Sequence, residues 1–503
     1  MNGFPILSVI LFAPVAGALL LVFIPPAEHK LIKAVAATAT FVSLALTVYA
    51  YAVYDQAVGG LQFVERVPWI KDLGVTYFLG VDGISLPMLL LIAIIGFTAI
   101  FASWNVNMRP REFFILFLTL VTGVMGTFVS MDLFIFLLFY EVVVIPIYIM
   151  VVIWGSTKRV TKEYAGMKLT IYLLVGSAFL LVAVIAVFIQ ALLITGKPDF
   201  SIYGLARVAF PLGFQRWTFA FMLFGFGSLL SMWPFHSWSP DGYAGAPTAV
   251  SMVHAGVLKK IGGYGLIRIA LLILPGGAAY WAPTIAVLGV AGAAYAAFGA
   301  LAQKDLKYIV GYSSVSHMGY VLLGIASLNV IGINGAVANM FAHGIMAALF
   351  FSTIGFVYEK THTRWVPDLG GLFQQMPRVG VAFVLAGLAS LGLPGLISFV
   401  PEFTIFLGSF GRYGGLSVVA IATIIITALF VLRAVANTLY GPRREEYDHL
   451  TDIRGPEMVP LAVLGTVLVV GGLVPSLLFN MINSGVTPLV ASVTHTLRIG
   501  GVL

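Results

Sequence analysis

Long apolar stretches recur along this chain, and short polar stretches separate them. A bilayer core about 30 Å thick is crossed by roughly 20 helical residues. Runs of that kind predict fourteen membrane-spanning helices, near 4–24, 31–53, 84–104, 113–131, 133–154, 165–195, 217–237, 247–272, 282–302, 306–328, 332–358, 379–411, 414–438 and 458–481. Two of these runs, 165–195 and 379–411, exceed one bilayer thickness, which predicts tilting, kinks or breaks. The pattern therefore predicts an all-α polytopic membrane protein.

Composition supports this class. The chain has 503 residues, of which 60% are hydrophobic and 9% charged, whereas soluble domains carry roughly 25% charged residues. The absence of cysteine excludes disulfides, thiolate metal sites and iron–sulfur clusters held by this chain. The apolar run from Met1 to Ile24 lacks a basic leader and a small-residue cleavage site, so we expect it to be a retained first helix.

Basic residues gather in the odd-numbered connections between the predicted helices. These are Lys30, Lys33, Arg109, Arg111, Lys158, Arg159, Lys162, Lys304, Lys307, Lys360, Arg364, Arg378, Arg443, Arg444 and Arg454. Connection 6, with Lys197, Arg207 and Arg216, is the exception. The positive-inside rule then puts odd connections in the cytoplasm and both termini outside it. This placement accounts for the net charge of +7 without a nucleic-acid partner.

Two of the apolar segments are interrupted by glycine and proline in the same style. One runs from Gly225 to His236 through Pro234, and the other runs from Leu391 to Glu402. They lie about five helices apart, and a repeat of five spans must insert with opposite topology in its second copy. Paired broken helices in an inverted repeat indicate a transport pathway near the bilayer midplane. The alternative is two ordinary proline kinks.

Several charged residues fall inside the apolar runs, where a charge costs roughly 2.5–3.5 kcal/mol on insertion scales. Glu141 has strongly apolar flanks, which favours a titrating carboxyl over a fixed ion pair. Lys259 and Lys260 point about 100° apart on a helix, so they cannot both face one cavity. We expect Lys260 to be the pathway lysine, whereas Lys259 either shares that role or reaches the lipid headgroups.

Histidines and a second carboxylate complete the candidate set. His317 lies among hydroxyl residues and His343 lies one predicted helix later; either transfers protons or is a hydrogen-bonded packing residue. Glu402 follows Pro401 at the second interruption, where exposed backbone groups favour proton access. No phosphate-binding loop, dinucleotide fingerprint or nucleophile elbow is present, so these residues predict ion transfer rather than covalent catalysis.

The chain resembles the antiporter-like subunits of respiratory complex I. The resemblance rests on Pro234-Phe-His-Ser-Trp-Ser-Pro-Asp241, Leu-Gly-Val-Asp82-Gly-Ile-Ser-Leu, Lys260-Ile-Gly-Gly-Tyr-Gly and Asp305-Leu-Lys-Tyr-Ile-Val-Gly-Tyr-Ser-Ser-Val-Ser-His317. The run Tyr358-Glu-Lys-Thr-His-Thr-Arg364 favours the subunit M (chain 4) branch over its paralogues. The resemblance covers nearly the whole chain, and the motifs together are specific where each alone would be moderate.

The resemblance implies fourteen helices, with helices 4–8 and 9–13 as inverted repeats and helices 7 and 12 broken. It divides the chain into N-terminal helices (1–111), a first repeat (112–275), a second repeat (276–440) and a cytoplasmic loop with a C-terminal helix (441–503). By motif position it implies that Glu141, Lys260, His317, His343 and Glu402 transfer protons. It also implies a bacterial inner-membrane location, other complex I membrane-arm subunits as partners, and flavin, iron–sulfur clusters and quinone in those partners, with no cofactor in this chain.

One position departs from the family pattern. Family members carry a lysine on helix 7, five residues before the proline of the Pro-Phe-His motif, and that position is Leu229 here. Leucine cannot carry a proton or pair with Glu141. Nearby His236, His254 and Lys259 are polar and are candidates to compensate. The other reading is a subunit whose input half-channel is altered or silent.

Four functions remain open from the sequence. The first is an energy-converting subunit of a proton-pumping NADH:quinone oxidoreductase. The second is a subunit of a multisubunit cation/proton antiporter, which has no redox partners and depends on sodium or potassium. The third is a scaffold subunit that moves no protons. The fourth is a subunit of a membrane-bound hydrogenase or of a ferredoxin-driven relative, because other chains determine the electron donor. Substitution of Glu141, Lys260 and Glu402 separates the third from the others, because a scaffold would keep its activity.

Overall fold

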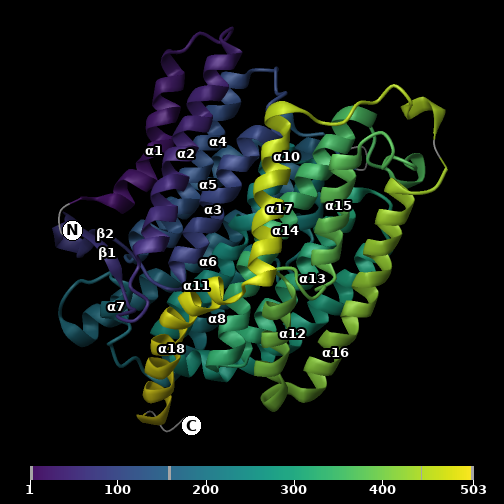
Figure 1. Ribbon diagram of the computed structural model, residues 1–503. Coiled ribbons are helices and arrows are strands. Elements are labelled where there is room, and N and C mark those ends of the chain that lie inside the picture. Colours follow the sequence, from purple (N-terminus) through teal and green to yellow (C-terminus); the bar gives the residue numbers. More distant parts are fainter. Residues whose placement is uncertain (1–3, 157–159, 443, 500–503) are drawn as a thin grey trace.

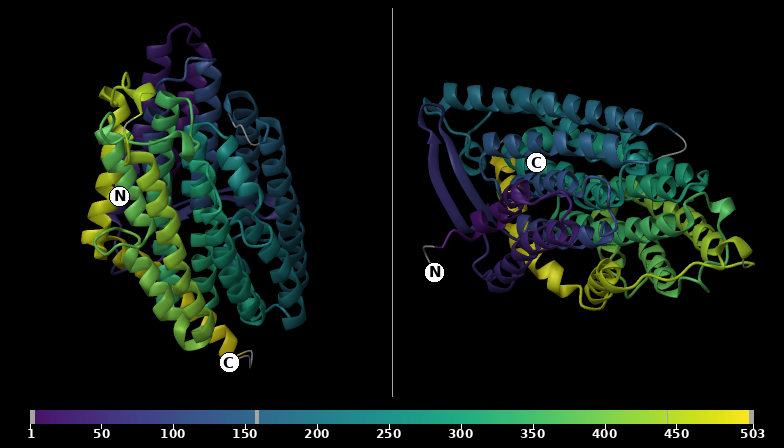
Figure 2. Two further views of the ribbon diagram at one scale, coloured as in Figure 1. Left: turned by 90° about the vertical axis from the view of Figure 1, so that its right-hand side faces the viewer. Right: turned by 90° about the horizontal axis from the view of Figure 1, so that it is seen from above.

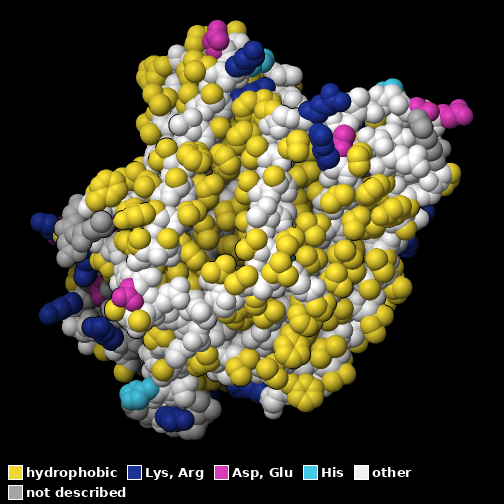
Figure 3. Space-filling view, viewed as in Figure 1, with side chains coloured by type: hydrophobic (Ala, Val, Ile, Leu, Met, Phe, Trp, Pro, Cys, Tyr) yellow, Lys and Arg dark blue, Asp and Glu magenta, His cyan; other side chains and the backbone are white. Residues whose placement is uncertain are grey.

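The computed structural model describes residues 4–156, 160–442 and 444–499, and it is a bundle of long helices (Figure 1). Twelve helices of the described chain are long and apolar enough to cross a membrane. They are α1 (Ile6–Phe23), α2 (His29–Val53), α3 (Ser85–Ala102), α4 (Pro110–Val129), α5 (Leu133–Trp154), α6 (Lys162–Thr195), α12 (Pro275–Leu301), α13 (Leu306–Ala326), α14 (Val330–Thr361), α16 (Phe399–Leu439), α17 (Met458–Leu473) and α18 (Ser476–Ile499). Their apolar side chains cover most of the face in Figure 3, and charged side chains gather toward its ends.

The fourteen predicted spans all have helical counterparts, but not all are single helices. The predicted seventh span is divided into α8 (Leu212–Leu229) and α9 (Trp238–Gly245). The eighth is a succession of short pieces, α10 (Thr248–Val253), η2 (His254–Leu258), α11 (Lys260–Gly265) and η3 (Leu266–Leu271), of which η2 and η3 are π-helical. The wider π turns flank Lys259 and Lys260, and such bulges are frequent at functional sites.

The second predicted break is also confirmed. The run 379–411 begins as α15 (Pro377–Ser390), loses helical geometry over 391–398 and resumes as α16. The predicted spans 379–411 and 414–438 share α16, whose backbone turns at Tyr413. Proline and glycine explain the break, because Pro394 removes a backbone donor, and Gly392 and Gly395 adopt positive φ.

The predicted all-α membrane fold is confirmed, and two features add to it. The connection between α2 and α3 forms an antiparallel hairpin of β1 (Gln62–Ile70) and β2 (Val75–Val81), joined by the short turn η1 (Lys71–Leu73), so the chain is not purely α-helical. The predicted last span, 458–481, ends with α17, and α18 follows as an additional amphipathic helix in contact with α14. The short helices α7 (Ile202–Leu205), η4 (Val366–Asp368), η5 (Glu445–Tyr447) and η6 (Gly455–Glu457) lie in connections.

The connections sort to two ends of the bundle. The α1–α2 and α16–α17 connections lie at the upper end in Figure 1, whereas the hairpin and the C-terminus lie toward the lower end. In the view from above, the hairpin runs along one side of the bundle (Figure 2). The predicted basic residues Lys158, Arg159 and Arg443 lie outside the described residues. The division at residues 111, 275 and 440 stays a prediction.

Candidate functional site

Lys259 and Lys260 lie at the centre of the bundle and point to different partners. The Lys260 Nζ atom lies 2.9 Å from Nδ1 of His343 and also donates to the carbonyl oxygen of Ala255. The Lys259 Nζ atom donates to the carbonyl oxygen of Ser314 over 2.8 Å. Both lysines are 0% exposed, so the expectation that Lys259 reaches the lipid headgroups is wrong. The divergence of the two side chains follows from their offset around the helix.

The two predicted histidines continue a row from Lys260. His343 on α14 and His317 on α13 are both buried, and their ring centroids lie 5.3 Å apart. On its far side, His317 Nδ1 lies 3.1 Å from Oε1 of Glu402, within ion-pair distance but without hydrogen-bond alignment. The Nε2 atom of the same ring lies 3.4 Å from the Ser390 hydroxyl. Four helices therefore bring Lys260, His343, His317 and Glu402 into one buried row.

The broken helix gives this row its polar end. Ser390 is the last residue of α15, and Glu402 lies in the first turn of α16. A helix C-terminus carries partial negative charge and an N-terminus carries partial positive charge. The break therefore places the carbonyl end of α15 at Ser390, beside His317, and the amide end of α16 near Glu402.

Glu402 also borders a cavity of about 590 Å³. The cavity is lined mainly by apolar side chains: Leu391, Phe399, Phe403, Phe406, Leu407, Phe410, Ile421 and Ile424. Gly392 lines the same space with φ +65°, and a β-carbon there would lie 2.7 Å from Oε2 of Glu402. The glycine therefore leaves room for the carboxylate as well as allowing the turn.

The auxiliary histidines lie away from this row. His254 packs against Trp238 and Tyr243, with ring centroids 5.2 and 5.1 Å away, and neither ring nitrogen has a hydrogen-bond partner in the described chain. His236, in the first break, packs edge-on against Tyr295 at 4.9 Å. Both rings are held mainly by aromatic contacts. Lys259 adjoins Lys260 in the chain, but its Nζ atom lies 5.6 Å from the centre of the Tyr243 ring, the ring that also packs against His254.

Glu141 is separate from the row as well. Its side chain is exposed on the outer surface of α5, with no hydrogen-bond or ion-pair partner among the described residues. Leu229, the last residue of α8, is 1% exposed and packs in the core. The structure thus unites four of the five predicted proton-transfer residues and leaves Glu141 facing outward.

Sequence reasoning missed three charged residues inside the bundle. Lys168 on α6 pairs with Asp241 over 2.7 Å, and Arg268 in η3 pairs with Asp82. Lys307 was expected in a cytoplasmic connection, but it is buried and donates to the carbonyl oxygen of Ala246 over 2.6 Å. Lys168 was detectable as the single charge within the apolar run 165–195, and Arg268 as a third charge, after Lys259 and Lys260, within 247–272. For Lys307, the only sequence feature that could have indicated burial was its position in the first turn of α13.

These contacts explain the motif carboxylates. Asp82 and Asp241 are partners of buried or half-buried cations, and Asp305 accepts from Arg364 over 2.8 Å while capping α13. Asp82 and Asp305 therefore fix connections against helices, and Asp241 joins α9 to α6. In the part of the chain that the structure describes, no group of three or more His, Asp or Glu side chains is placed to hold a metal ion.

Comparison with known proteins agrees with this architecture. Residues 130–427 match the family described as NADH:quinone oxidoreductase/Mrp antiporter, TM. The chain is 38% identical over 467 residues to NAD(P)H-quinone oxidoreductase chain 4 3 of Picosynechococcus sp., covering 91% of this chain and 83% of the relative. It is 37% identical over 505 residues to NAD(P)H-quinone oxidoreductase chain 4 of Acaryochloris marina, covering 97% and 93%.

Solved structures give the same fold. A chain of respiratory complex I from Thermus thermophilus matches with a TM-score of 0.88 at 26% identity, covering 98% of this chain and 99% of that one. A chain of the Mrp complex from Dietzia sp. matches with a TM-score of 0.80 at 22% identity, covering 98% and 97%, which is a likeness of fold. With more than half its length matched and chain 4 relatives above 30% identity, this multi-pass membrane protein belongs to the NADH:quinone oxidoreductase/Mrp antiporter transmembrane family.

Proposed function

We propose that this chain is a membrane-arm subunit of a proton-translocating NADH:quinone oxidoreductase and relays protons along Lys260, His343, His317 and Glu402. The observation that carries the proposal is the buried row itself, with separations of 2.9 Å between Lys260 and His343 and 3.1 Å between His317 and Glu402. Three types of titratable side chain, all removed from water, meet inside an apolar bundle. A purely structural core gains little from such an arrangement, because each unpaired charge would cost several kcal/mol.

The chemistry of the row suits proton transfer in steps. An ammonium at Lys260 can pass a proton to Nδ1 of His343, because a neutral imidazole nitrogen accepts a hydrogen bond at this distance. Transfer from His343 to His317 requires a ring rotation or a bridging water, since their ring centroids are 5.3 Å apart. Glu402 then receives the proton from Nδ1 of His317. The cycle closes when Glu402 releases this proton into the cavity that it borders and Lys260 takes up the next one.

Coulomb interactions give the row a way to respond to distant charge. Two unit charges 4 Å apart interact by about 4 kcal/mol at an effective dielectric constant of 20. Moving one proton from Lys260 toward Glu402 removes a buried cation at one end and a carboxylate charge at the other. A change of charge in a neighbouring subunit can therefore shift the position of the proton, which is how quinone chemistry elsewhere would drive transfer.

Proton supply from the cytoplasmic side has a structural candidate at Lys307. A pocket of about 330 Å³ is lined by Lys307, Glu359, Arg364 and neighbouring residues. Lys307 also contacts the hydroxyl of Ser251, over 3.3 Å, on the helix that carries the two central lysines. We take Lys259 to compensate for Leu229, because it is the one lysine among the three candidates and adjoins Lys260.

The outward-facing carboxylate indicates a partner. An exposed charge on a membrane-spanning helix costs roughly 2.5–3.5 kcal/mol against lipid, whereas a polar group of an adjacent subunit relieves that cost. We therefore assign the Glu141 face of α5 to a contact with another membrane-arm subunit. Flavin, iron–sulfur clusters and quinone belong to other subunits of the complex. The membrane is the bacterial inner membrane, and both termini face away from the cytoplasm.

The test is proton pumping by the intact complex in sealed vesicles, with NADH as donor. Glu402→Gln should lower the pumped protons per NADH and the coupled turnover at least several-fold, because the amide cannot receive the proton. Glu445→Gln, an exposed carboxylate in the last cytoplasmic connection, is the matched control and should behave as wild type. Wild-type proton yield in Glu402→Gln would contradict the proposal.

The same vesicles distinguish an oxidoreductase subunit from a cation/proton antiporter subunit. The antiporter is the second candidate because the fold is also that of a Mrp complex chain. A cation/proton antiporter would acidify or alkalinise the lumen in response to a sodium or potassium gradient without NADH. NADH-dependent pumping that is unchanged when sodium is replaced by choline supports the oxidoreductase assignment. Cation-gradient-dependent proton flux without NADH would move the chain to the antiporter class.

A further inference from the structure

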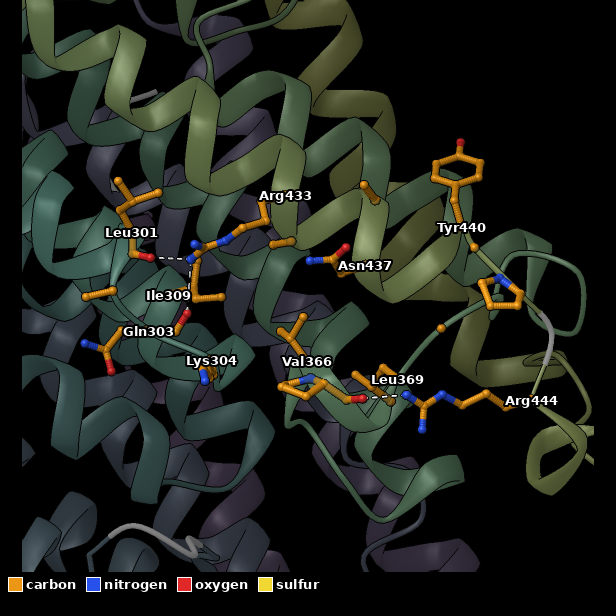
Figure 4. A pocket seen from close by; sticks show the side chains of 17 residues that line it. Leu301, Gln303, Lys304, Ile309, Val366, Leu369, Arg433, Asn437, Tyr440 and Arg444 are labelled. Carbon is orange, nitrogen blue, oxygen red and sulfur yellow. Dashed lines mark hydrogen bonds between the residues drawn. The ribbon is translucent and has the colours of Figure 1, made fainter.

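We propose that the pocket between α12 and α16 binds the phosphate-bearing headgroup of an anionic membrane phospholipid. The pocket has a volume of about 600 Å³ and is seen from close by in Figure 4. Three cationic side chains line it: Lys304 in the α12–α13 connection, Arg433 on α16 and Arg444 beyond the end of α16. The proposal is independent of the proton relay.

The cations of this pocket are under-neutralised. Arg433 donates through Nη2 to the carbonyl oxygens of Leu301 and Gln303, which leaves Nε and Nη1 without a partner among the described residues (Figure 4). No carboxylate of the described chain lies within ion-pair distance of Arg433 or Lys304. Only Arg444 has an acidic neighbour, Glu446 at 3.5 Å, and both of those side chains are solvent-accessible.

The depth of Arg433 matches a headgroup. It lies six residues before Leu439, the last residue of α16, which corresponds to about 9 Å along the helix axis. Lys304 and Arg444 fall in predicted cytoplasmic connections, so the pocket faces the leaflet in which anionic lipids attract basic residues. Guanidinium groups bind phosphate oxygens in a planar fork, which suits Arg433 to a phosphodiester.

An apolar stripe continues from the pocket toward the membrane interior. Ile425 and Leu429 lie eight and four residues before Arg433, hence on the same face of α16, and they are 67% and 56% exposed. Phe298 on the neighbouring α12 is 60% exposed and lies one turn before Leu301. Cations above a continuous apolar stripe match a phospholipid with its acyl chains, whereas free phosphate would use the cations alone.

A competing reading is that Arg433 serves only to cap the C-terminal carbonyls of α12. Capping involves only the Nη2 atom of Arg433, and it does not explain why Lys304 and the exposed apolar stripe lie beside it. The two readings differ in whether lipid is held there, which crosslinking can measure.

The experiment uses the intact complex in nanodiscs that contain phosphatidylglycerol with a photoactivatable acyl chain. Mass spectrometry should map crosslinks to peptides containing Phe298 or Leu429, and the same group on phosphatidylcholine should label them less. Arg433→Ala and Lys304→Ala should each lower this labelling about fivefold, since one surface cation contributes roughly that factor. Arg412→Ala, which removes a cation from the same helix near Tyr413, is the matched control and should not change it.

Lys304→Ala keeps the test decisive if Arg433→Ala fails to assemble, because Lys304 is exposed and makes no described side-chain contact. Equal labelling by the two lipids, or unchanged labelling in Lys304→Ala, would overturn the proposal. Labelling that excess inorganic phosphate abolishes would assign the cations to free phosphate and also overturn it.

Discussion

At the scale of single residues, chemistry depends on which neighbours each charge meets. Lys259 and Lys260 are adjacent and equally buried, yet only Lys260 contacts the histidine row. The π turns around them change the register of the helix by a residue, so neighbouring side chains leave it in different directions. The role of each lysine therefore follows from local backbone geometry as well as residue type.

Lys259 is predicted to replace the lysine that Leu229 lacks. Lys259→Leu should lower coupled NADH turnover several-fold, because no second lysine then adjoins Lys260 to replace the lysine missing from α8. Adding Leu229→Lys to that variant should restore part of the activity, since it returns a cation to α8 close to the same helix. Turnover assays on the two variants check this; wild-type turnover in Lys259→Leu would mean that Lys259 is structural.

Asp132 provides a pH-dependent contribution to stability outside the spanning segments. Burial raises the pKa of this carboxyl from 3.8 to about 6, although it accepts hydrogen bonds from the amides of Thr76, Phe134 and Ile135. The folded state therefore binds the proton more tightly than the unfolded chain. Its stabilising contribution is full below the unfolded pKa, about 4, and is lost as the pH rises through about 6.

The free energy of unfolding should fall by at most about 3 kcal/mol, because each pKa unit corresponds to about 1.36 kcal/mol and burial raises this pKa by about two. Thermal unfolding of the detergent-purified complex from about pH 5 to about pH 7.5 should show a falling Tm for the wild type relative to Asp132→Asn. Asparagine stays neutral over this range and keeps one accepting oxygen for the start of α5. Parallel pH profiles for the two proteins would contradict the assignment.

At the scale of elements, most of the framework was predictable and the exceptions have clear causes. Span length and Gly/Pro interruptions gave the helices and both breaks, because these signals are local. The hairpin at 62–81 was missed because its strands lie in a polar connection, where the length of apolar runs carries no information. Continuity of apolar residues past Leu473 concealed the end of α17 and the start of α18.

The site residues also divide into those that local sequence identifies and those whose positions depend on the packing of distant helices. Charges within apolar runs identified Lys260 and Glu402, but the meeting of His343, His317 and Glu402 depends on how α14, α13 and α16 pack. That packing involves residues up to about 140 positions apart along the chain, beyond the reach of periodicity. The outward direction of Glu141 was likewise unpredictable, since almost every position on α5 is apolar and no polar face marks its orientation.

The break at 391–398 is predicted to position Glu402 through Gly392. Gly392→Ala should lower pumping and destabilise the protein by about 1 kcal/mol or more, because its φ is +65° and the new methyl group meets the carboxylate. Gly395→Ala is the matched control: its φ is +90°, yet no atom lies within 4 Å of the added β-carbon. Stability should fall in both variants, and proton yield should fall more in Gly392→Ala. Equal proton yields in the two variants would show that Gly392 does not position Glu402 for proton transfer.

At the scale of the whole molecule, the relay and the outward carboxylate suggest a subunit that works within an array. Lys260 to Glu402 crosses the second half of the bundle, whereas Glu141 faces away from it on α5. In that arrangement the surface carboxylate couples one subunit to the next, and the buried row moves the proton within the subunit.

Glu141→Gln tests that coupling. We expect lower coupled turnover with an assembled complex of normal composition, because the amide keeps the shape of the contact but loses its charge. Glu163→Gln, a carboxylate at the start of α6, serves as a control for charge removal from the same half of the chain. Wild-type turnover and proton yield in Glu141→Gln would show that this carboxylate takes no part in energy conversion.

The most direct measurement of the central claim is the number of protons pumped per NADH oxidised by vesicles containing Lys260→Met, beside Lys30→Met as the control. Methionine fills a similar volume without a proton, and Lys30 is an exposed lysine at the start of α2, outside both the row and the proposed lipid pocket. A buried relay through Lys260 predicts a marked loss of proton yield in Lys260→Met and none in Lys30→Met. Wild-type yield in both variants would contradict the relay, and the row from Lys260 to Glu402 would then have to be explained as a structural polar core.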